Sequence, residues 1–143
     1  MSTLEQRIQI IEDRQALQHL LSSYLVALDD LSDIEHALSF FTQDAVFDMS
    51  AMAYPSCHGI EALREFFTGV FFNLTHSAHF ATNFKIKSLG QNRASAQSHA
   101  IAMGQPAEGE RVMLYVQYHL EFKRVDSGWK IQSFRGQPLM PIE

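Results

Sequence analysis

A change in hydrophobic periodicity near Thr75 divides this chain into two parts. Before Thr75 apolar residues recur every three or four positions, and from there to Gln137 they alternate with polar ones. The first spacing is typical of helices and the second of strands with one buried face. Polar turns at 90–92, 104–109 and 126–128 divide the alternating part into four long strands. Helices followed by an antiparallel meander predict an α+β domain whose helices pack on one side of a strongly curved sheet.

The local signals also give approximate boundaries for each element. Thr3 and Gln6 can form a capping box for a first helix. A polar break at 13–15 suggests that this helix bends, and Ser32 with Glu35 predicts the cap of a short second helix. The further elements expected are a short strand at 45–49, a loop at 50–59, a helix that starts at 59 and ends near 72, and long strands at 76–89, 93–103, 112–124 and 129–137.

Length and composition indicate one globular domain over residues 1–143. Phenylalanine dominates the aromatic residues, with 11 Phe against 4 Tyr and 1 Trp. Phe carries a large apolar area without a polar group, so an apolar core or an apolar cavity is expected. The net charge of −5 argues against nucleic acid or an anionic membrane as a partner, because both require a basic surface.

The cysteine count and the N-terminus suggest where the protein is found. Cys57 is the only cysteine, which excludes a disulfide within the chain and fits a reducing compartment. The first residues carry charges where a secretory signal would need an apolar segment. We therefore expect a soluble, cytoplasmic protein.

The clearest candidate for a functional residue is His79, on the first of the long strands. With a period of two, His79 shares a face with Ser77, Ala81 and Asn83, and small and polar residues of this kind leave room for a pocket. The alternative is a histidine that is merely hydrogen-bonded within the sheet. Two adjacent carboxylates, Asp29 and Asp30, end the first helix; they form either a solvated turn or a partner for this imidazole.

Metal and nucleotide sites are not indicated. His76 and His79 lie three residues apart on a strand and therefore point to opposite faces. No HExxH motif, cysteine pair or glycine-rich phosphate loop occurs. We expect neither a metal nor another cofactor, and we interpret Cys57 as incidental.

Five segments, in this order and spacing, resemble the SnoaL-like branch of the nuclear transport factor 2-like superfamily. They are YLVALD at 24–29, FTQDAVF at 41–47, GIEAL at 59–63, HFATN at 79–83 and GWKI at 128–131. The resemblance implies a cone-shaped, cystatin-like α+β barrel with a mixed or antiparallel sheet, three N-terminal helices and a mainly apolar pocket. It also implies a homodimer as the usual assembly.

Within that superfamily the chain most resembles scytalone dehydratase and its SnoaL-like relatives. In those proteins an Asp after the first helix pairs with a His on the first long strand. The resemblance implies His79 as general acid and base and Asp30, or Asp29 in its place, as the group that orients it. The residues expected to line the substrate pocket are Tyr24, Asp29, Asn83, His99, Tyr54 and Phe66.

Three functions remain open from these features. The first is binding of a small hydrophobic, cyclic molecule with cofactor-independent dehydration, isomerisation or cyclisation. The second is a non-catalytic ligand-binding or accessory subunit, as in ring-hydroxylating oxygenase small subunits. The third is a protein that binds no small molecule because its own Phe side chains fill the pocket, so that only its dimer matters. The strand at 112–124 carries bulky residues on both faces, so we expect a second copy to cover the outer sheet face.

Overall fold

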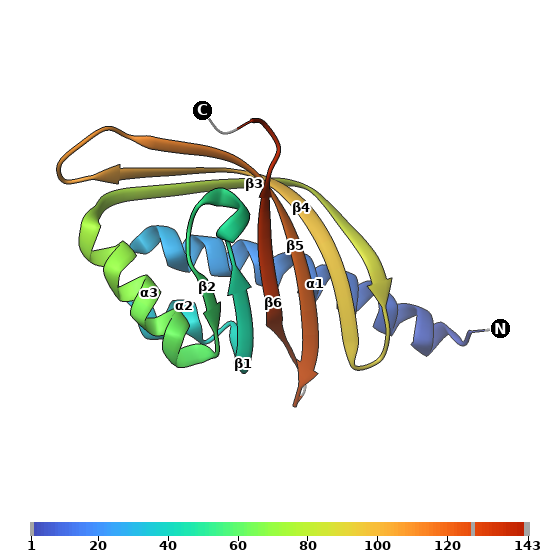
Figure 1. Cartoon of the computed structure of the whole chain (residues 1–143). Coiled ribbons are helices and arrows are strands. Elements are labelled where there is room, and N and C mark those ends of the chain that lie inside the picture. Colours follow the sequence, from blue (N-terminus) through green and yellow to red (C-terminus); the bar gives the residue numbers. More distant parts are fainter. Residues whose placement is uncertain (1, 127, 142–143) are drawn as a thin grey trace.

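The computed structural model describes residues 2–126 and 128–141 and has the predicted α+β architecture (Figure 1). Its elements are α1 (Leu4–Asp30), α2 (Ile34–Leu38), β1 (Phe41–Asp48), the 3-10 helix η1 (Ser50–Met52), β2 (Ser56–His58), α3 (Ile60–Asn73), β3 (Leu74–Leu89), β4 (Arg93–Pro106), β5 (Val112–Val125) and β6 (Gly128–Pro138). The long strands lie where the alternation predicts them and run slightly further. β1 begins at Phe41 rather than at position 45.

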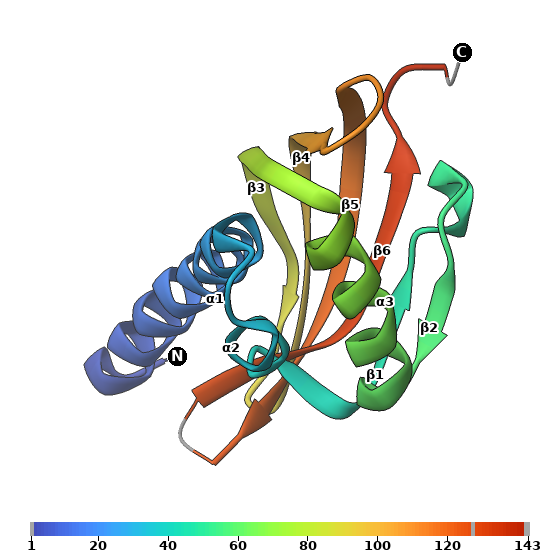
Figure 2. The ribbon, with the colours of Figure 1, turned by 90° about the vertical axis from the view of Figure 1, so that its left-hand side faces the viewer.

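The strands form one sheet in the order β2-β1-β6-β5-β4-β3. Neighbouring strands are antiparallel except β1 and β6, which are parallel. The sheet curves strongly, and α1, α2 and α3 lie on its concave side (Figure 2). The predicted mixed sheet with helices on one face is confirmed.

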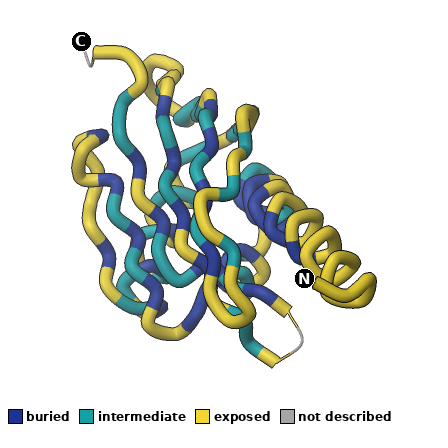
Figure 3. The backbone as a smooth tube through the Cα atoms, turned by 90° about the vertical axis from the view of Figure 1, so that its right-hand side faces the viewer, coloured by how far each residue is buried: buried dark blue, intermediate teal, exposed yellow. Residues whose placement is uncertain are grey.

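Helix α1 is continuous, so the bend expected at 13–15 is wrong. The capping box of Thr3 and Gln6 is present. Asp13, which suggested the break, is buried and accepts hydrogen bonds from Arg124 Nη2 at 2.7 Å and Trp129 Nε1 at 3.2 Å. The polar residue therefore faces partners on β5 and β6, and the helix does not need to open for it. Residues 4–12 are exposed and extend beyond the sheet (Figure 3).

The cap of α2 also differs from the prediction. Asp33, not Ser32, caps the helix, and its side chain accepts a hydrogen bond from the backbone N–H of His36 at 3.1 Å. Glu35 is engaged elsewhere, because it forms an ion pair with Arg64 of α3 at 2.9 Å. This ion pair connects α2 to α3 at the surface.

The two faces of the sheet have different environments. The inner face of β5 contributes Val116, Tyr118, Leu120 and Phe122 to the buried core, as the alternation predicts. Along β4, β5 and β6 these buried residues alternate with intermediate and exposed residues, which point to the outer face (Figure 3). None of the helices in the part of the chain that the structure describes combines the length and apolar character needed to cross a membrane.

Candidate active site

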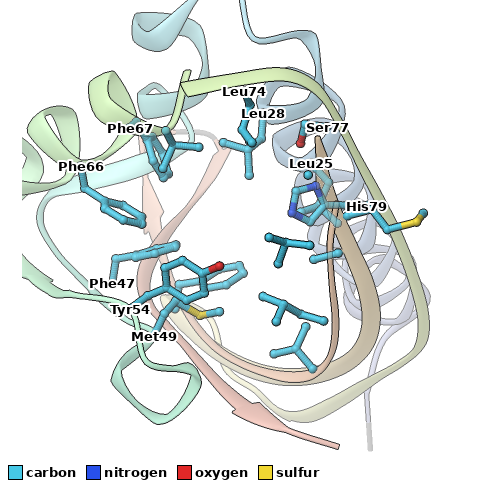
Figure 4. Close-up of a pocket in the computed structure, with 18 of the residues that line it drawn as sticks. Leu25, Leu28, Phe47, Met49, Tyr54, Phe66, Phe67, Leu74, Ser77 and His79 are labelled. Carbon is cyan, nitrogen blue, oxygen red and sulfur yellow. The ribbon is translucent and has the colours of Figure 1, made fainter. Parts of the chain in front are cut away.

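A cavity of about 450 Å³ lies between the concave face of the sheet and the helices (Figure 4). Its volume lies within the range of roughly 300–1,000 Å³ that is typical of small-molecule sites. The lining residues are Tyr24, Leu25, Leu28, Phe47, Met49, Tyr54, Phe66, Phe67, Gly69, Val70, Asn73, Leu74, Ser77, His79, Ala102, Met103, Gly104, Val112, Leu114, Val116, Tyr118 and Phe134. Most are apolar, and the phenylalanines line the space without filling it. The exposed side chains of Tyr54 and Val112 belong to this wall, so the cavity reaches the surface beside them.

The polar centre of the wall is the pair formed by Asp29 and His79. Nδ1 of His79 lies 2.5 Å from Oδ1 of Asp29. The other carboxylate oxygen, Oδ2, accepts the backbone N–H of His79 at 2.8 Å. The hydroxyl of Ser77 donates to Oδ1 at 2.9 Å. The carboxylate is thus held by three donors from β3, and the imidazole ring is fixed at the cavity wall (Figure 4).

Two elements that are distant in sequence bring these groups together. Asp29 lies in the last turn of α1, which packs against β3 beside Ser77 and His79. The two strand residues share a face because they are two positions apart, and both line the cavity on the concave side. Ala102 of β4 pairs with His79 across the sheet, and its small side chain leaves room for the imidazole. The pair is partly shielded, with side-chain exposures of 24% for Asp29 and 13% for His79.

The expectation that Asp30 pairs with His79 is wrong. Asp30 is exposed and accepts a hydrogen bond from the Ser32 hydroxyl. Successive residues on a helix are rotated by about 100°, so only one of the two adjacent carboxylates can face the sheet. That residue is Asp29, which follows the buried Leu28. Asp29 itself does not line the cavity and lies behind the imidazole, so its expected contact with substrate is corrected as well.

Asn83 and His99 do not line the cavity either. The pairing of β3 with β4 is irregular between Thr82 and Lys85, and Asn83 has a φ of 56°. Such a bulge interrupts the strict alternation of faces. Asn83 is consequently exposed, and its Nδ2 lies 3.1 Å from Nδ1 of His99. His99 lies between the buried inward residues Ser98 and Ala100 and therefore faces outward.

The other expected pocket residues, Tyr24, Tyr54 and Phe66, do lie in the cavity wall. Three polar wall residues were absent from the expected set, Asn73, Ser77 and Tyr118. The alternation of the strands could have found two of them, because Ser77 shares a face with His79 and Tyr118 belongs to the inner face of β5. Burial, followed by the charges of Tyr118 and Asp29, raises the pKa of Tyr24 well above its usual value. Burial and the charge of Asp29 also raise the pKa of Tyr118.

Among residues 2–126 and 128–141, no cluster of three or more His, Cys, Asp or Glu side chains could hold a metal ion. Cys57 is buried in β2, and burial together with the charge of Glu65 raises the pKa of its thiol. A thiol of this kind is a poor nucleophile. The chemistry that the wall can offer therefore centres on the imidazole of His79.

The sequence model of the SnoaL-like domain family matches residues 9–135. The chain belongs to the SnoaL-like family. A solved structure from Novosphingobium aromaticivorans, provisionally named an aromatic ring hydroxylase, is 40% identical to this SnoaL-like chain. It aligns over 92% of each chain with a TM-score of 0.89.

Two further structures from Novosphingobium aromaticivorans share the fold at lower identity. One, provisionally named a scytalone dehydratase, is 21% identical over 92% of this chain and 87% of its own, with a TM-score of 0.82. The other is described as nuclear transport factor 2-like with a cystatin-like fold; it is 18% identical over 97% and 92%, with a TM-score of 0.78. The resemblance to this superfamily and fold is thereby confirmed. Among curated protein sequences, none matches the chain significantly.

Proposed function

We propose that this SnoaL-like protein binds a small, largely hydrophobic, cyclic molecule and carries out acid–base chemistry on it without a cofactor. The reaction class is dehydration, isomerisation or cyclisation. The observation that carries the proposal is the His79 ring, held by Asp29 at the wall of an apolar cavity. An imidazole oriented by a carboxylate beside a water-poor space is the usual arrangement for proton transfer to and from carbon or oxygen.

The hydrogen-bond pattern determines which nitrogen reacts. An ionised carboxylate only accepts hydrogen bonds, so the proton of a neutral His79 lies on Nδ1, facing Asp29. Nε2 then presents its lone pair to the ligand. In a dehydration, Nε2 removes a proton from carbon and the C–H electrons form the double bond. The hydroxyl group leaves the adjacent carbon and takes the proton back from the imidazolium as water. In an isomerisation, the proton returns to a different carbon.

The relatives support two functions. The fold shared with the structure named a scytalone dehydratase is compatible with elimination chemistry. The more similar structure, at 40% identity, carries the name of an aromatic ring hydroxylase. This name points to an aromatic ligand. The second candidate is an accessory or ligand-binding subunit, in which the same cavity holds such a ligand and His79 transfers no proton.

Solvent exchange separates the two candidates. The wild-type protein would be incubated in D₂O with cyclic β-hydroxyketones, and deuterium at the carbon beside the carbonyl and loss of water would be followed by NMR. We expect exchange or elimination above the buffer rate for compounds that bind the cavity. Proton transfer by a positioned side chain contributes typically about 10²- to 10⁴-fold, so the difference is readily measured.

The matched control is the His79→Gln variant, which keeps a polar side chain but has no group able to take up a proton at neutral pH. Ligand binding would be measured for both proteins. Binding without exchange above the level of His79→Gln would contradict the acid–base function and leave the accessory role.

We also propose that two copies associate through the outer sheet face. Phe80, Ile101 and Tyr115 are paired across β3, β4 and β5 and form one exposed apolar row. Their exposed fractions are 60%, 37% and 43%, which is unusually high for large apolar side chains that neighbour one another.

The assembly can be tested by light scattering after gel filtration. We expect a mass of about twice the 16.3 kDa of one chain for the wild type, because covering this row removes apolar area from water. The double variant Phe80→Lys/Tyr115→Lys is expected to be monomeric. Val26→Lys is the control, since Val26 is 70% exposed on α1, away from the row. A monomeric wild type, or a dimer that survives both lysines, would argue against this interface.

A further inference from the structure

The first turns of α1, which extend beyond the sheet, carry a stripe of exposed apolar side chains (Figure 3). Leu4, Ile8 and Ile11 are 68%, 45% and 56% exposed. Single exposed apolar residues are common on protein surfaces, but these three lie about one helical turn apart and form a continuous row. An exposed apolar row marks a surface that another molecule covers. We call these three residues the α1 seam.

The α1 seam is not a continuation of the hydrophobic core. Each residue of an α-helix is rotated by about 100° from the one before it. By this rotation the seam lies on the side of α1 opposite to Leu17, Leu20 and Tyr24, which are buried in the core. Ile10 lies on the core side of the same turns and is 44% exposed. The core of one chain therefore cannot cover the seam.

The seam has the spacing of a coiled coil. A step of four residues joins Leu4 to Ile8, and a step of three joins Ile8 to Ile11. These steps correspond to the heptad positions d, a and d. A β-branched residue at a with leucine at d favours two parallel helices, and Ile8 and Leu4 provide this combination.

The charges beside the seam favour one orientation of a second helix. Glu5 and Glu12 occupy e positions of this heptad, and Arg7 and Arg14 occupy g positions. None of the four forms an ion pair with another residue that the structure describes. In a parallel pair, g faces e of the other helix, so Arg7 lies beside Glu12 of a second copy. An antiparallel pair would place arginine beside arginine and glutamate beside glutamate.

We infer that the α1 seams of two copies pair as a short, parallel coiled coil. The helix is already formed, because Thr3 and Gln6 cap it and its remaining turns pack in the core, so pairing does not have to order it. Three apolar residues make a small contact, so the association is weak and is lost on dilution during gel filtration. Mixed acidic and basic flanks suit a second copy better than a membrane, which attracts basic helices.

Sedimentation equilibrium at submillimolar protein tests the pairing. The Phe80→Lys/Tyr115→Lys chain would serve as the background, so that the outer sheet face does not contribute. We expect this chain to dimerise as its concentration rises. A further Ile8→Lys substitution is expected to weaken the dimer about 100-fold, because one isoleucine is lost from the contact in each copy.

Ile10→Lys is the matched control. It makes the same change on the same turns of α1, and the two isoleucines are 44% and 45% exposed, but Ile10 faces away from the seam. Equal dimerisation of the two lysine variants, or a background chain that stays monomeric throughout, would overturn the inference. Neither result bears on the sheet interface, which is tested separately with the wild type.

A charge exchange tests the orientation in the same background. Arg7→Glu and Glu12→Arg are each expected to weaken the dimer several-fold at low ionic strength, because each places like charges side by side. The double exchange Arg7→Glu/Glu12→Arg restores opposite charges and the net charge of the background, so the affinity is expected to return. Stronger association of Arg7→Glu alone would indicate antiparallel helices and contradict the parallel pair.

Disulfide trapping reports the register directly. The a positions of a parallel pair face each other, so Ile8→Cys is expected to form a linked dimer in a glutathione redox buffer. Ile10→Cys points away from the seam and is expected to stay unlinked. The native Cys57 is buried, so the parent chain provides the blank. Equal linking of the two cysteine variants would show random collision and would overturn the ordered pair.

Discussion

The Asp29→Asn variant is expected to lose about 10²- to 10⁴-fold in turnover, whereas Asp30→Asn is expected to turn over like the wild type. The two substitutions make the same chemical change at adjacent positions. Only Asp29 contacts His79, while Asp30 is exposed and bonded to Ser32. Comparison of the two variants therefore separates the effect on the imidazole from the loss of one negative charge at the end of α1.

The loss follows from the arrangement of donors around Asp29. One carboxylate oxygen accepts the backbone N–H of His79, and the other accepts the Ser77 hydroxyl and Nδ1–H of His79. An asparagine has only one acceptor oxygen, which the backbone N–H requires because it can only donate. The amide nitrogen then faces Nδ1, so Nδ1 must accept and the ring proton moves to Nε2. An imidazole protonated on Nε2 cannot take a proton from the ligand.

Two measurements check this prediction. The first is the rate of deuterium exchange or elimination, with thermal unfolding and ligand affinity as controls for folding and binding. The second needs no substrate: ¹⁵N chemical shifts of His79 report which nitrogen carries the proton. Wild-type shifts in Asp29→Asn, or equal rates for the Asn variants at 29 and 30, would remove Asp29 from the proposed mechanism.

The Asp13→Ala variant is expected to lower the free energy of unfolding by about 3 kcal/mol, the lower end of the range for breaking a buried ion pair. Asp13 Oδ2 accepts from Arg124 and Oδ1 accepts from the buried indole N–H of Trp129. Its removal leaves the indole without a partner and leaves the guanidinium at the edge of the core without its carboxylate. Arg124 retains a hydrogen bond to the Gln91 carbonyl oxygen and its stacking over Trp129, which is why the lower end is expected.

The same carboxylate makes stability depend on pH. Burial raises the pKa of Asp13. The hydrogen bonds from Arg124, Trp129 and Gln9 and the charge of Arg124 lower it by more, so the pKa lies below the usual value of 3.8. A carboxyl group with a depressed pKa contributes stability above its unfolded pKa and loses it as the pH falls towards the folded value. We expect the wild type to lose stability below about pH 4, and Asp13→Ala to lose less over this interval.

Chemical denaturation at neutral and acid pH measures both effects, and a thermal scan should show a fall in Tm of roughly 10 °C. Glu12→Ala is the matched control, because the neighbouring carboxylate is exposed on the same turn of α1. If the variants at 12 and 13 unfold at the same denaturant concentration, the buried network does not stabilise the fold as described.

The sequence predicted the secondary structure well because the signals are local. The period of two, the turn residues and the capping box of Thr3 and Gln6 each depend on neighbours within a few positions. It failed where a long-range partner decided the outcome. The expected bend at 13–15 is absent because Asp13 finds Arg124 and Trp129, more than 100 residues away. Similarly, Glu35 pairs with Arg64 of α3, and Asp33 caps α2.

The candidate site shows the same division. The alternation of β3 was sufficient to place Ser77 and His79 on the concave face, and the two carboxylates at the end of α1 were recognised as candidate partners. Which of Asp29 and Asp30 faces the sheet depends on the rotation of α1 against β3. That rotation is decided by packing of the whole helix. The irregular pairing near Asn83 could not be predicted from the sequence either, because a bulge is a property of two paired strands.

By itself, the sequence determined the order of the elements, the inner face of each long strand and the position of His79, because periodicity and turn chemistry are encoded residue by residue. Only the tertiary structure decided that Asp29 holds the imidazole, that Asn83 and His99 lie outside the cavity, and that Tyr24 and Tyr118 share one wall. These relations join α1 to β3 and β5 across long stretches of chain. They depend on helix rotation and strand register, which no local pattern specifies.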